Sequence, residues 1–427
     1  MIKRTIDAQT NLSVISVFLC LNIIGFCYYS YFFVENGYLP SPFLHDKTNT
    51  FMDLFNPMYW AYDDGRYTEW GSVYPPLVFI ALKLINALFF GSIYAYAEAM
   101  REDSIYVVIG FILIFLTIPA FVLKIKSWEN FSLNEKILIY FAIILSSPML
   151  FALERGNVIV FIPIILALVL SKIGFFRAGS IAILINIKPY FVLLLLYYVS
   201  RRNWRGLLSC MVLSSLIFFI TGLALDENFY IFFKNLIKFS QEESLFSLSE
   251  VMAMPSSVSA FSYALKSIGV FQIAAEHLGS NIASIAIEFI EVAKWAVVSF
   301  AMIAIFAKSH LARDAEIFCL LTIVISNIGI WVGGYSLIFY FALIPTLINM
   351  QQKKIYLYFL LMFVMPIDFI SLKDSFVGVQ FSYLANSLQD IHWTLGVGSI
   401  LRPAVNILFL LVISYELYIR NEKRVNG

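Results

Sequence analysis

Long apolar runs recur along the whole sequence, and they limit the folds open to it more than any other feature. The runs cover approximately residues 12–34, 105–123, 137–153, 157–172, 179–199, 206–225, 284–307, 315–332, 336–350, 355–370 and 396–419. A helix needs roughly 20 apolar residues to cross the hydrocarbon core of a bilayer. Only 13% of the residues are charged, whereas soluble domains carry about 25%. The sequence therefore predicts an all-α polytopic membrane protein, a bundle of about 11–13 transmembrane helices.

The charged and metal-binding residues exclude several classes of protein. The formal net charge is +1 and no basic tract occurs, so nucleic acid is not an expected partner. The four cysteines lie inside apolar runs without CxxC spacing, and the four histidines form no HExxH motif. Neither a Walker loop nor a GxGxxG element occurs. We therefore expect no disulfide framework, no zinc site and no cofactor.

The basic residues indicate how the spans are oriented. Lys3 and Arg4 precede the first run, which is too long for the core of a signal peptide and predicts an uncleaved signal-anchor. By the positive-inside rule, the basic loops and both termini face the cytoplasm, and the polar segments 35–72, 226–283 and 371–395 lie outside. We expect an integral protein of the bacterial cytoplasmic membrane with its functional site on the external face.

Lys188-Pro189 interrupts an apolar run whose two ends both look cytoplasmic. Lys172 and Arg177 precede this run and Arg201 follows it, yet a single span would put its ends on opposite sides. Proline breaks a helix and pushes the preceding residue out of helical geometry. We favour a hairpin of two short helices with Lys188 at its outer tip. The alternative is one kinked span in which Lys188 snorkels to the surface.

Residues 74–90 are long enough to cross the membrane, but their flanks argue against a crossing. External acidic residues precede them, and Glu98, Glu102 and Asp103 follow. A helix that begins at Pro75-Pro76 and lies along the outer face of the membrane satisfies both flanks. A spanning helix remains the alternative.

The first external segment combines carboxylates with aromatic residues next to the membrane. Its candidates for contact with a substrate are Asp53, Tyr59, Asp64, Arg66 and Tyr74. Asp53 lies between Met52 and Leu54, an apolar setting that is typical of reactive carboxylates. An acid in an external loop is more often a solvated charge, and Tyr and Trp are common at every membrane interface.

Glu154-Arg155-Gly156-Asn157 separates two apolar runs with almost no loop around it. Both charges must lie near membrane depth, where ionisable groups are expensive and are candidates for function. The alternative is an ordinary loop in which Glu154 and Arg155 neutralise each other. We treat Glu154, Arg155 and Asn157 as candidate binding residues.

Lys188 provides a second cation at the same height as Arg155. Such a pair suits a phosphate group that is anchored by a lipid tail. Two weaker candidate segments are 256–261 and 333–340, and the second includes Tyr335 and Tyr340. Their glycines and hydroxyls could line a polar pocket, although an ordinary helix turn explains them at least as well.

Four elements, in order along the chain, resemble motifs of polyprenyl-phosphate-sugar-dependent glycosyltransferases with the C-type membrane fold, and most closely those of glycosyltransferase family 87. They are Asp53-Leu-Phe-Asn-Pro-Met-Tyr59 with Tyr74-Pro-Pro-Leu77, Pro148 with Glu154-Arg155-Gly156-Asn157, Ile187-Lys188-Pro189 with Arg201-Arg202-Asn-Trp204-Arg205, and Ser336 to Tyr340 with Ile344-Pro345. The resemblance covers about residues 50–350. Gly156-Asn157 replaces the family's Gly-Gln-x-Asn, and Tyr335 or Tyr340 stands where the family has His. Both departures affect the identity of the sugar.

This resemblance implies a C-type glycosyltransferase bundle with external juxtamembrane helices and a particular reaction. A hexose, with mannose favoured, passes with inversion from a polyprenyl-phosphate donor to a lipid- or glycan-linked acceptor outside the membrane. A loop carboxylate acts as the general base, and we expect this to be Asp53, with Asp46 and Asp64 as alternatives. Arg155 and Lys188 would stabilise the leaving phosphate. With two cations present, we expect no metal.

The resemblance also divides the chain into three parts. Residues 1–225, with the first external loop at 35–104, form the catalytic membrane module. Residues 226–283 form another external loop, and residues 284–427 supply the helices that complete the bundle.

Two other functions remain open at this point. An O-antigen or polysaccharide polymerase or ligase would take a polyprenyl-pyrophosphate glycan. Such enzymes rely on arginines in later external loops, whereas residues 226–283 contain none. A lipid or glycan transporter should show internal repeats with broken helices at matched positions, and the Lys188-Pro189 break has no counterpart in the second half.

Overall fold

The computed structural model describes most of the chain, and its elements are mainly helical. The residues that it describes are 2–40, 43, 50–89, 94–125, 128–129, 131–170, 174–226, 229–241, 281–328, 337–350, 355–356, 358–360 and 370–420. The elements of the first half are α1 (Ile2–Asn36), α2 (Met52–Trp60), η1 (Asp64–Arg66), α3 (Pro76–Phe89), α4 (Ala97–Asp103), α5 (Ile105–Lys124), α6 (Leu133–Ile144), α7 (Ser147–Arg155), η3 (Val158–Phe161), α8 (Ile162–Val169), α9 (Gly174–Ile187), η4 (Pro189–Leu195) and α10 (Leu196–Ser200). Those of the second half are α11 (Trp204–Leu223), α12 (Phe229–Gln241), α16 (Asn281–Lys308), η6 (Ser309–Leu311), α17 (Asp314–Ile328), α18 (Phe339–Ile348), β1 (Ser371–Ser382), β2 (Ser387–Gly396) and α20 (Gly398–Tyr418).

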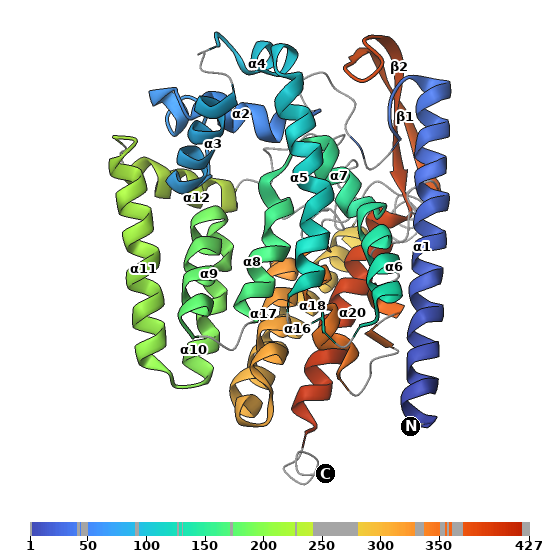
Figure 1. The fold of residues 1–427 in the computed structure, drawn as a ribbon, viewed down its shortest axis with the longest axis vertical. Coiled ribbons are helices and arrows are strands. Elements are labelled where there is room, and N and C mark those ends of the chain that lie inside the picture. Colours follow the sequence, from blue (N-terminus) through green and yellow to red (C-terminus); the bar gives the residue numbers. More distant parts are fainter. Residues whose placement is uncertain are drawn as a thin grey trace.

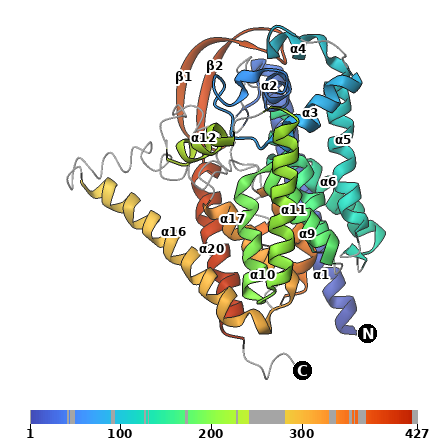
Figure 2. The same ribbon diagram turned by 90° about the vertical axis from the view of Figure 1, so that its left-hand side faces the viewer.

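The long helices run side by side and give the molecule two distinct ends (Figure 1). One end, which we call the upper end, carries α2, α3, α4 and the turn between β1 and β2. The start of α1 and the end of α20 lie at the other end, which we call the lower end. Figure 2 shows that α16 diverges from the rest of the bundle toward its N-terminal end. Residues 51–72 therefore lie at the end opposite the start of α1 and the end of α20.

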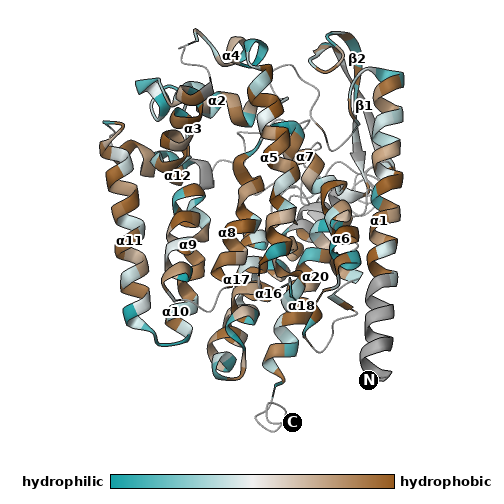
Figure 3. Ribbon diagram, in the orientation of Figure 1, coloured by the Kyte–Doolittle hydropathy of each residue, from teal (hydrophilic) through white to brown (hydrophobic). Residues whose placement is uncertain are grey.

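Five described helices are long and apolar enough to cross a membrane, and α6 with α7 forms a further candidate that bends by 53°. The five stretches are Ser13–Asn36, Ile105–Lys124, Trp204–Leu223, Glu288–Leu311 and Leu401–Tyr418. The span in α11 has a mean hydropathy of 2.1, yet only 11% of it is buried inside the protein. Apolar residues likewise dominate the sides of the bundle in Figure 3. A surface this apolar requires lipid around it, and the predicted all-α polytopic membrane protein is confirmed.

Several predicted runs form short or bent helices because prolines interrupt them. Pro148 lies in the first turn of α7 and Pro163 in the first turn of α8. Proline lacks the N–H that would continue a preceding helix, whereas the first turn of a new helix tolerates it. The run at 355–370 lies mostly outside the described residues.

Residues 174–200 fold back on themselves at Lys188. Arg177, near the start of α9, donates a hydrogen bond from Nη1 to the hydroxyl of Tyr197 in α10, at 2.6 Å. In one continuous helix these residues, 20 positions apart, would be separated by about 30 Å. The predicted hairpin is confirmed. Lys188 forms its tip with an extended backbone (φ −142°, ψ 114°), and Pro189 begins the returning η4.

The helix predicted within residues 74–90 is α3, and it is short. It has 14 residues, fewer than the roughly 20 that a crossing requires. It begins at Pro76 and lies with α2 and α4 at the upper end (Figure 1). These features agree with the interpretation that α3 lies at the membrane face.

A β-hairpin, which the sequence did not predict, occupies most of the polar segment after residue 370. Strands β1 and β2 pair antiparallel from Ser371 opposite Gly396 to Ser382 opposite Ser387. The hairpin adjoins the segment after α1, where the Ser382 hydroxyl donates to the carbonyl of Gly37 at 2.5 Å. The N–H of His392 donates to the Tyr38 hydroxyl at 3.1 Å, which ties β2 to the segment after α1.

Ion pairs at the lower end hold the 174–200 hairpin against later helices. Asp314, at the start of α17, lies 2.9 Å from Nη1 of Arg177 and 2.9 Å from Nη2 of Arg201. Glu316 lies 2.7 Å from Nη1 of Arg420, beyond the end of α20. Both side chains of the pair between Glu316 and Arg420 are largely buried, so breaking it would leave an uncompensated charge between α17 and the end of α20. The two pairs with Asp314 connect the base of the hairpin to α17.

Candidate active site

Asp53 lies in the first turn of α2, at the upper end of the molecule. This helix begins after Phe51, whose backbone is left-handed (φ 60°, ψ 4°). The N–H of Phe51 donates to the carbonyl of Glu154 at 2.7 Å, so the start of α2 is fastened to α7. The positive end of a helix dipole stabilises a carboxylate. Because 19% of the Asp53 side chain is exposed, a substrate can reach it.

Arg155 and Asn157 hold Asp53 from the end of α7. Nη2 of Arg155 lies 2.6 Å from Oδ1 of Asp53, and Nδ2 of Asn157 donates to Oδ2 at 2.7 Å. The Asn157 amide is oriented by a second bond, because its Oδ1 accepts from the N–H of Ile159 at 3.0 Å. Both carboxylate oxygens of Asp53 are therefore bonded to side chains of the segment 155–157.

Gly156 allows α2 and α7 to approach each other closely. It caps the C-terminus of α7 with φ 68°, a conformation that glycine adopts without strain. A Cβ at this position would lie 3.1 Å from the Cβ of Leu54 and 3.1 Å from the carbonyl oxygen of Phe51. The ion pair between Asp53 and Arg155 therefore depends on a residue without a side chain.

Replacing Gly156 with alanine should lower the melting temperature of the protein. The left-handed backbone would cost about 1–2 kcal/mol, and the added methyl group would also push Leu54 away from α7. Gly71→Ala is the matched control, because Gly71 has φ 58° but no atom lies within 4 Å of a Cβ there. Thermal unfolding in detergent should show a larger decrease for Gly156→Ala. Equal decreases would mean that the close approach is unimportant.

Lys188 and Tyr74 complete the site. Nζ of Lys188 lies 4.1 Å from the centre of the Tyr74 ring, a cation–π contact. Asp53 acts electrostatically on both side chains, and Asn157 lies beside the Tyr74 hydroxyl. Burial, and after it the charge of Asp53, raises the pKa of Tyr74 well above its usual range, so the phenol keeps its proton at neutral pH. We call Asp53, Tyr74, Arg155, Asn157 and Lys188 the Asp53 cluster.

The Asp53 cluster combines one carboxylate with two cations. An accessible carboxylate can take a proton from a hydroxyl group. A guanidinium presents several N–H donors in a fixed fork, whereas an ammonium is a compact point charge, and both bind phosphate. The arrangement therefore suits the transfer of a group from an anionic leaving group to a hydroxyl.

Glu154 lies beside the Asp53 cluster and fastens the segment before α2. Its Oε1 accepts a hydrogen bond from the hydroxyl of Thr50 at 2.9 Å, and the residue is only 6% exposed. Together with the backbone bond to Phe51, this contact keeps residues 50 and 51 against α7. Glu154 thereby helps to place Asp53.

The structure does not bring Tyr59, Asp64 and Arg66 into the cluster. The Tyr59 ring packs edge-on against Trp70, with 6.0 Å between ring centres. The Asp64 side chain is fully exposed. The Arg66 guanidinium is buried and donates to backbone carbonyls, including that of Leu225 at 3.4 Å. Arg66 therefore joins the segment after α2 to the residues that follow α11, a structural role.

The later candidates lie elsewhere. Tyr340 is buried in the core, where its hydroxyl bonds Ser326 of α17 and Asn406 of α20. Tyr335, the segment 256–261 and the alternative base Asp46 lie outside the described residues.

Arg101 lies near the Asp53 cluster, although no pattern in the sequence marked it as a candidate site residue. It is 1% exposed, and its Nη1 donates to the carbonyl of Thr50 at 2.7 Å. Its guanidinium also lies 4.0 Å from the centre of the Tyr383 ring, in the turn between β1 and β2. Arg101 stands among acidic residues in the sequence, which is typical of a solvated helix. Only the folded chain shows that it connects α4, the β-hairpin and the segment before α2.

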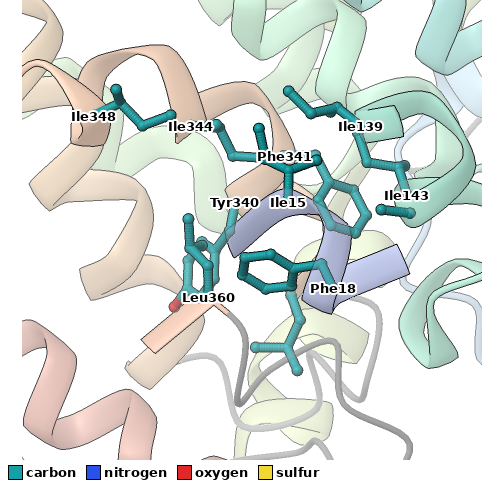
Figure 4. A pocket seen from close by; sticks show the side chains of 11 residues that line it. Ile15, Phe18, Ile139, Ile143, Tyr340, Phe341, Ile344, Ile348 and Leu360 are labelled. Carbon is teal, nitrogen blue, oxygen red and sulfur yellow. The ribbon is translucent and has the colours of Figure 1, made fainter. Parts of the chain in front are cut away.

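A small apolar cavity lies apart from these residues, among α1, α6 and α18 (Figure 4). Its volume is about 50 Å³, and its lining includes Ile15, Phe18 and Ile139. No residue of the Asp53 cluster lines it, and Tyr340 is its single polar side chain among those described. The cavity therefore offers no group for catalysis.

Across the described residues, no three His, Cys, Asp or Glu side chains gather where they could hold a metal ion. The expectation of a reaction without metal stays a prediction.

Comparison with known proteins gives the family of the chain. A family model described as glycosyltransferase family 87 matches residues 73–328, which is more than half of the sequence. No curated protein and no solved structure matches. The matched segment contains every member of the Asp53 cluster except Asp53, which is bound to it through Arg155 and Asn157. This multi-pass membrane protein therefore belongs to glycosyltransferase family 87.

Proposed function

We propose that the protein is an inverting glycosyltransferase that moves a hexose from a polyprenyl-phosphate donor to a lipid- or glycan-linked acceptor. The observation that carries this proposal is the Asp53 cluster, in which an accessible carboxylate pairs with Arg155 and interacts electrostatically with Lys188. We place the cluster outside the cytoplasmic membrane of a bacterium. The junction of α10 and α11, which carries the basic residues Arg202 and Arg205, lies at the lower end with the start of α1 and the end of α20, in keeping with a cytoplasmic position for that end (Figure 1). Among hexoses, the resemblance described above favours mannose.

The charges of the cluster support a phosphate leaving group. Negative charge gathers on the phosphate as its bond to the sugar breaks, and cations in a partly dry site stabilise that charge. Only 13% of the Arg155 side chain is exposed, and Lys188 is half-buried. A guanidinium has five N–H donors, so Arg155 can contact Asp53 and a phosphate together.

A groove beside Lys188 supports a donor with a lipid tail. Its volume is about 240 Å³. Pro75 and Pro189, which adjoin Tyr74 and Lys188, line it together with phenylalanines of α11 and α12. Apolar chains leave water for such surfaces. An isoprenoid chain whose phosphate meets Lys188 would place its first units in this groove.

The reaction follows from these positions. A hydroxyl oxygen of the acceptor attacks C1 of the sugar, and Asp53 takes the hydroxyl proton as the new C–O bond forms. The bond from C1 to the phosphate oxygen breaks, and its electron pair stays with the phosphate. Polyprenyl phosphate then leaves beside Arg155 and Lys188. A single displacement of this kind inverts the configuration at C1.

Replacing Lys188 with methionine should lower kcat/KM for the donor by about 10- to 100-fold, equivalent to a charge-assisted hydrogen bond of about 1.5–3 kcal/mol. Methionine keeps an apolar stem but loses the charge. Lys83→Met is the matched control, because Nζ of Lys83 also lies over a tyrosine ring, 5.1 Å from the centre of Tyr62. Steady-state kinetics with varied donor should show the loss only in Lys188→Met. Equal kinetics in the two variants would remove Lys188 from the phosphate site.

The proposed function is tested by offering the purified protein a set of labelled donors in lipid nanodiscs. The set contains polyprenyl-phosphate mannose, glucose and galactose, the corresponding nucleotide sugars and a polyprenyl-pyrophosphate oligosaccharide, with a membrane-lipid extract and dodecyl hexosides as acceptors. We expect consumption of a polyprenyl-phosphate hexose with release of one polyprenyl phosphate for each sugar transferred. Use of the nucleotide sugars or of the pyrophosphate donor instead would refute the proposal.

A further inference from the structure

A second groove lies beside the segments that carry Asp53 and Arg155, and the reaction described above leaves it without a role. Its volume is about 500 Å³, within the usual range for ligand sites. It lies between α1, the segment before α2, and α7, and we call it the α1–α7 groove. Its lining is largely apolar, with Phe26, Phe33 and Leu150 as examples, and its polar groups include Thr50 and Glu154.

The outer part of the α1–α7 groove adjoins the lipid. Ser13–Asn36 of α1 is a candidate membrane span, and α1 lies at the edge of the bundle (Figure 1). Phe26 is 44% exposed and Val34 is 78% exposed, and both line the groove. An apolar chain can therefore enter from the bilayer without passing through water.

The inner part of the groove adjoins the reacting groups. Phe51 forms part of its wall and stands two positions before Asp53. Leu153 and Glu154, also in the lining, immediately precede Arg155. None of the five cluster residues lines the groove itself, but a molecule that fills it lies against the two chain segments that carry Asp53 and Arg155.

Charge distinguishes the α1–α7 groove from the groove beside Lys188. The carboxylate of Glu154 and the hydroxyl of Thr50 form one hydrogen-bonded pair of polar groups in the lining. A carboxylate repels a phosphate, whereas carboxylate and hydroxyl oxygens accept hydrogen bonds from sugar hydroxyls. The anionic donor therefore fits the groove beside Lys188, and an uncharged head group with hydroxyls fits the α1–α7 groove.

We infer that the acceptor is an amphiphile whose apolar chain lies in the α1–α7 groove and whose hydroxyl reaches Asp53. This inference rests on the proposed function and adds the chemical class of the acceptor. It also assigns separate entrances to the two substrates, with the donor between α11, α12 and the tip of the 174–200 hairpin, and the acceptor beside α1.

The first experiment measures how acceptor efficiency depends on chain length. Methyl, octyl and dodecyl hexosides serve as acceptors in nanodiscs, and Ser30→Trp fills the groove, because Ser30 lines it. Ile24→Trp is the matched control, since Ile24 lies on the same helix, is 59% exposed and does not belong to the lining. Partition of the longer chains into lipid affects both variants equally.

We expect the wild-type protein and Ile24→Trp to use the dodecyl hexoside at least about tenfold more efficiently than the methyl hexoside, because each buried methylene contributes to binding. In Ser30→Trp this ratio should fall to about twofold, with KM for the donor unchanged. If Ser30→Trp instead raises KM for the donor and keeps the acceptor ratio, the groove holds the donor tail and the inference is overturned.

A second experiment does not depend on turnover. A dodecyl hexoside with a photoreactive diazirine on its chain is crosslinked to the wild-type protein, and the labelled peptides are identified by mass spectrometry. Labels in residues 26–39 and 150–154 that are lost in Ser30→Trp would support the groove, even if no hexose donor is consumed, in which case only the proposed function would fail. Labels confined to α11 and α12 would overturn the inference.

Discussion

Asp53→Asn should reduce kcat by about 10²- to 10⁴-fold, the usual contribution of a general base. The amide cannot take a proton from the acceptor hydroxyl. Its NH₂ group would also face a donor in either orientation, because Oδ1 of Asp53 accepts from Arg155 and Oδ2 accepts from Asn157 at 2.7 Å. Asn157 cannot turn its own oxygen toward this group without losing the bond to the N–H of Ile159. Turnover of a polyprenyl-phosphate hexose, measured at saturating donor and acceptor, reports the loss.

Asp103→Asn is the matched control, because Asp103 is an exposed carboxylate at the end of α4, also at the upper end. It should keep wild-type turnover. Melting temperatures would separate a loss of chemistry from a loss of folding. If Asp53→Asn keeps more than about a tenth of the wild-type rate, another group is the base, and variants of Asp64 and Asp46 would identify it.

Arg155→Gln should lower kcat/KM for the donor by about 10²- to 10³-fold, as expected when a group that stabilises developing negative charge is removed. The change removes a cation from the phosphate and the partner that lies 2.6 Å from Asp53. Arg155→Lys should restore part of the loss, because lysine keeps the charge but not the fork of donors. Separate values of kcat and KM, with varied donor, are the measurement.

Arg205→Gln controls for the loss of a positive charge, because Arg205 is exposed and lies in the first turn of α11, at the lower end. Wild-type kinetics in Arg155→Gln would contradict its place in the site. If Arg155→Gln loses turnover but binds polyprenyl phosphate as tightly as the wild-type protein, Arg155 serves only to hold Asp53 and does not bind the phosphate.

The sequence predicts the composition of this site better than its geometry. Arg155 and Lys188 could be selected because charges near membrane depth are expensive and are retained for function. The Lys188-Pro189 break and the basic residues on both sides of it were enough to predict the hairpin. No local pattern shows that Asp53 pairs with Arg155, because 102 positions separate them and only the packing of α2 on α7 brings them together.

Other parts could not be read from the sequence because tertiary contacts decide them. Arg66 has the sequence context of a site residue, yet the carbonyls that it binds include Leu225, 159 positions away. No apolar run marks the β-hairpin in the sequence, and apolar residues such as Phe376 and Leu388 are exposed at 61% and 68%. The hairpin is held instead by contacts with the segment after α1. Arg101 is fixed by Thr50 and Tyr383, neither of which is near it in sequence.

The stereochemistry of transfer tests the central claim most directly. A polyprenyl-phosphate hexose of known anomeric configuration is converted by the purified protein with a dodecyl hexoside as acceptor, and NMR determines the configuration of the new glycosidic bond. A single carboxylate acting as base beside two phosphate-binding cations predicts inversion in every product molecule. A product with retained configuration would require a covalent or otherwise double displacement, and the role assigned to Asp53 would be wrong.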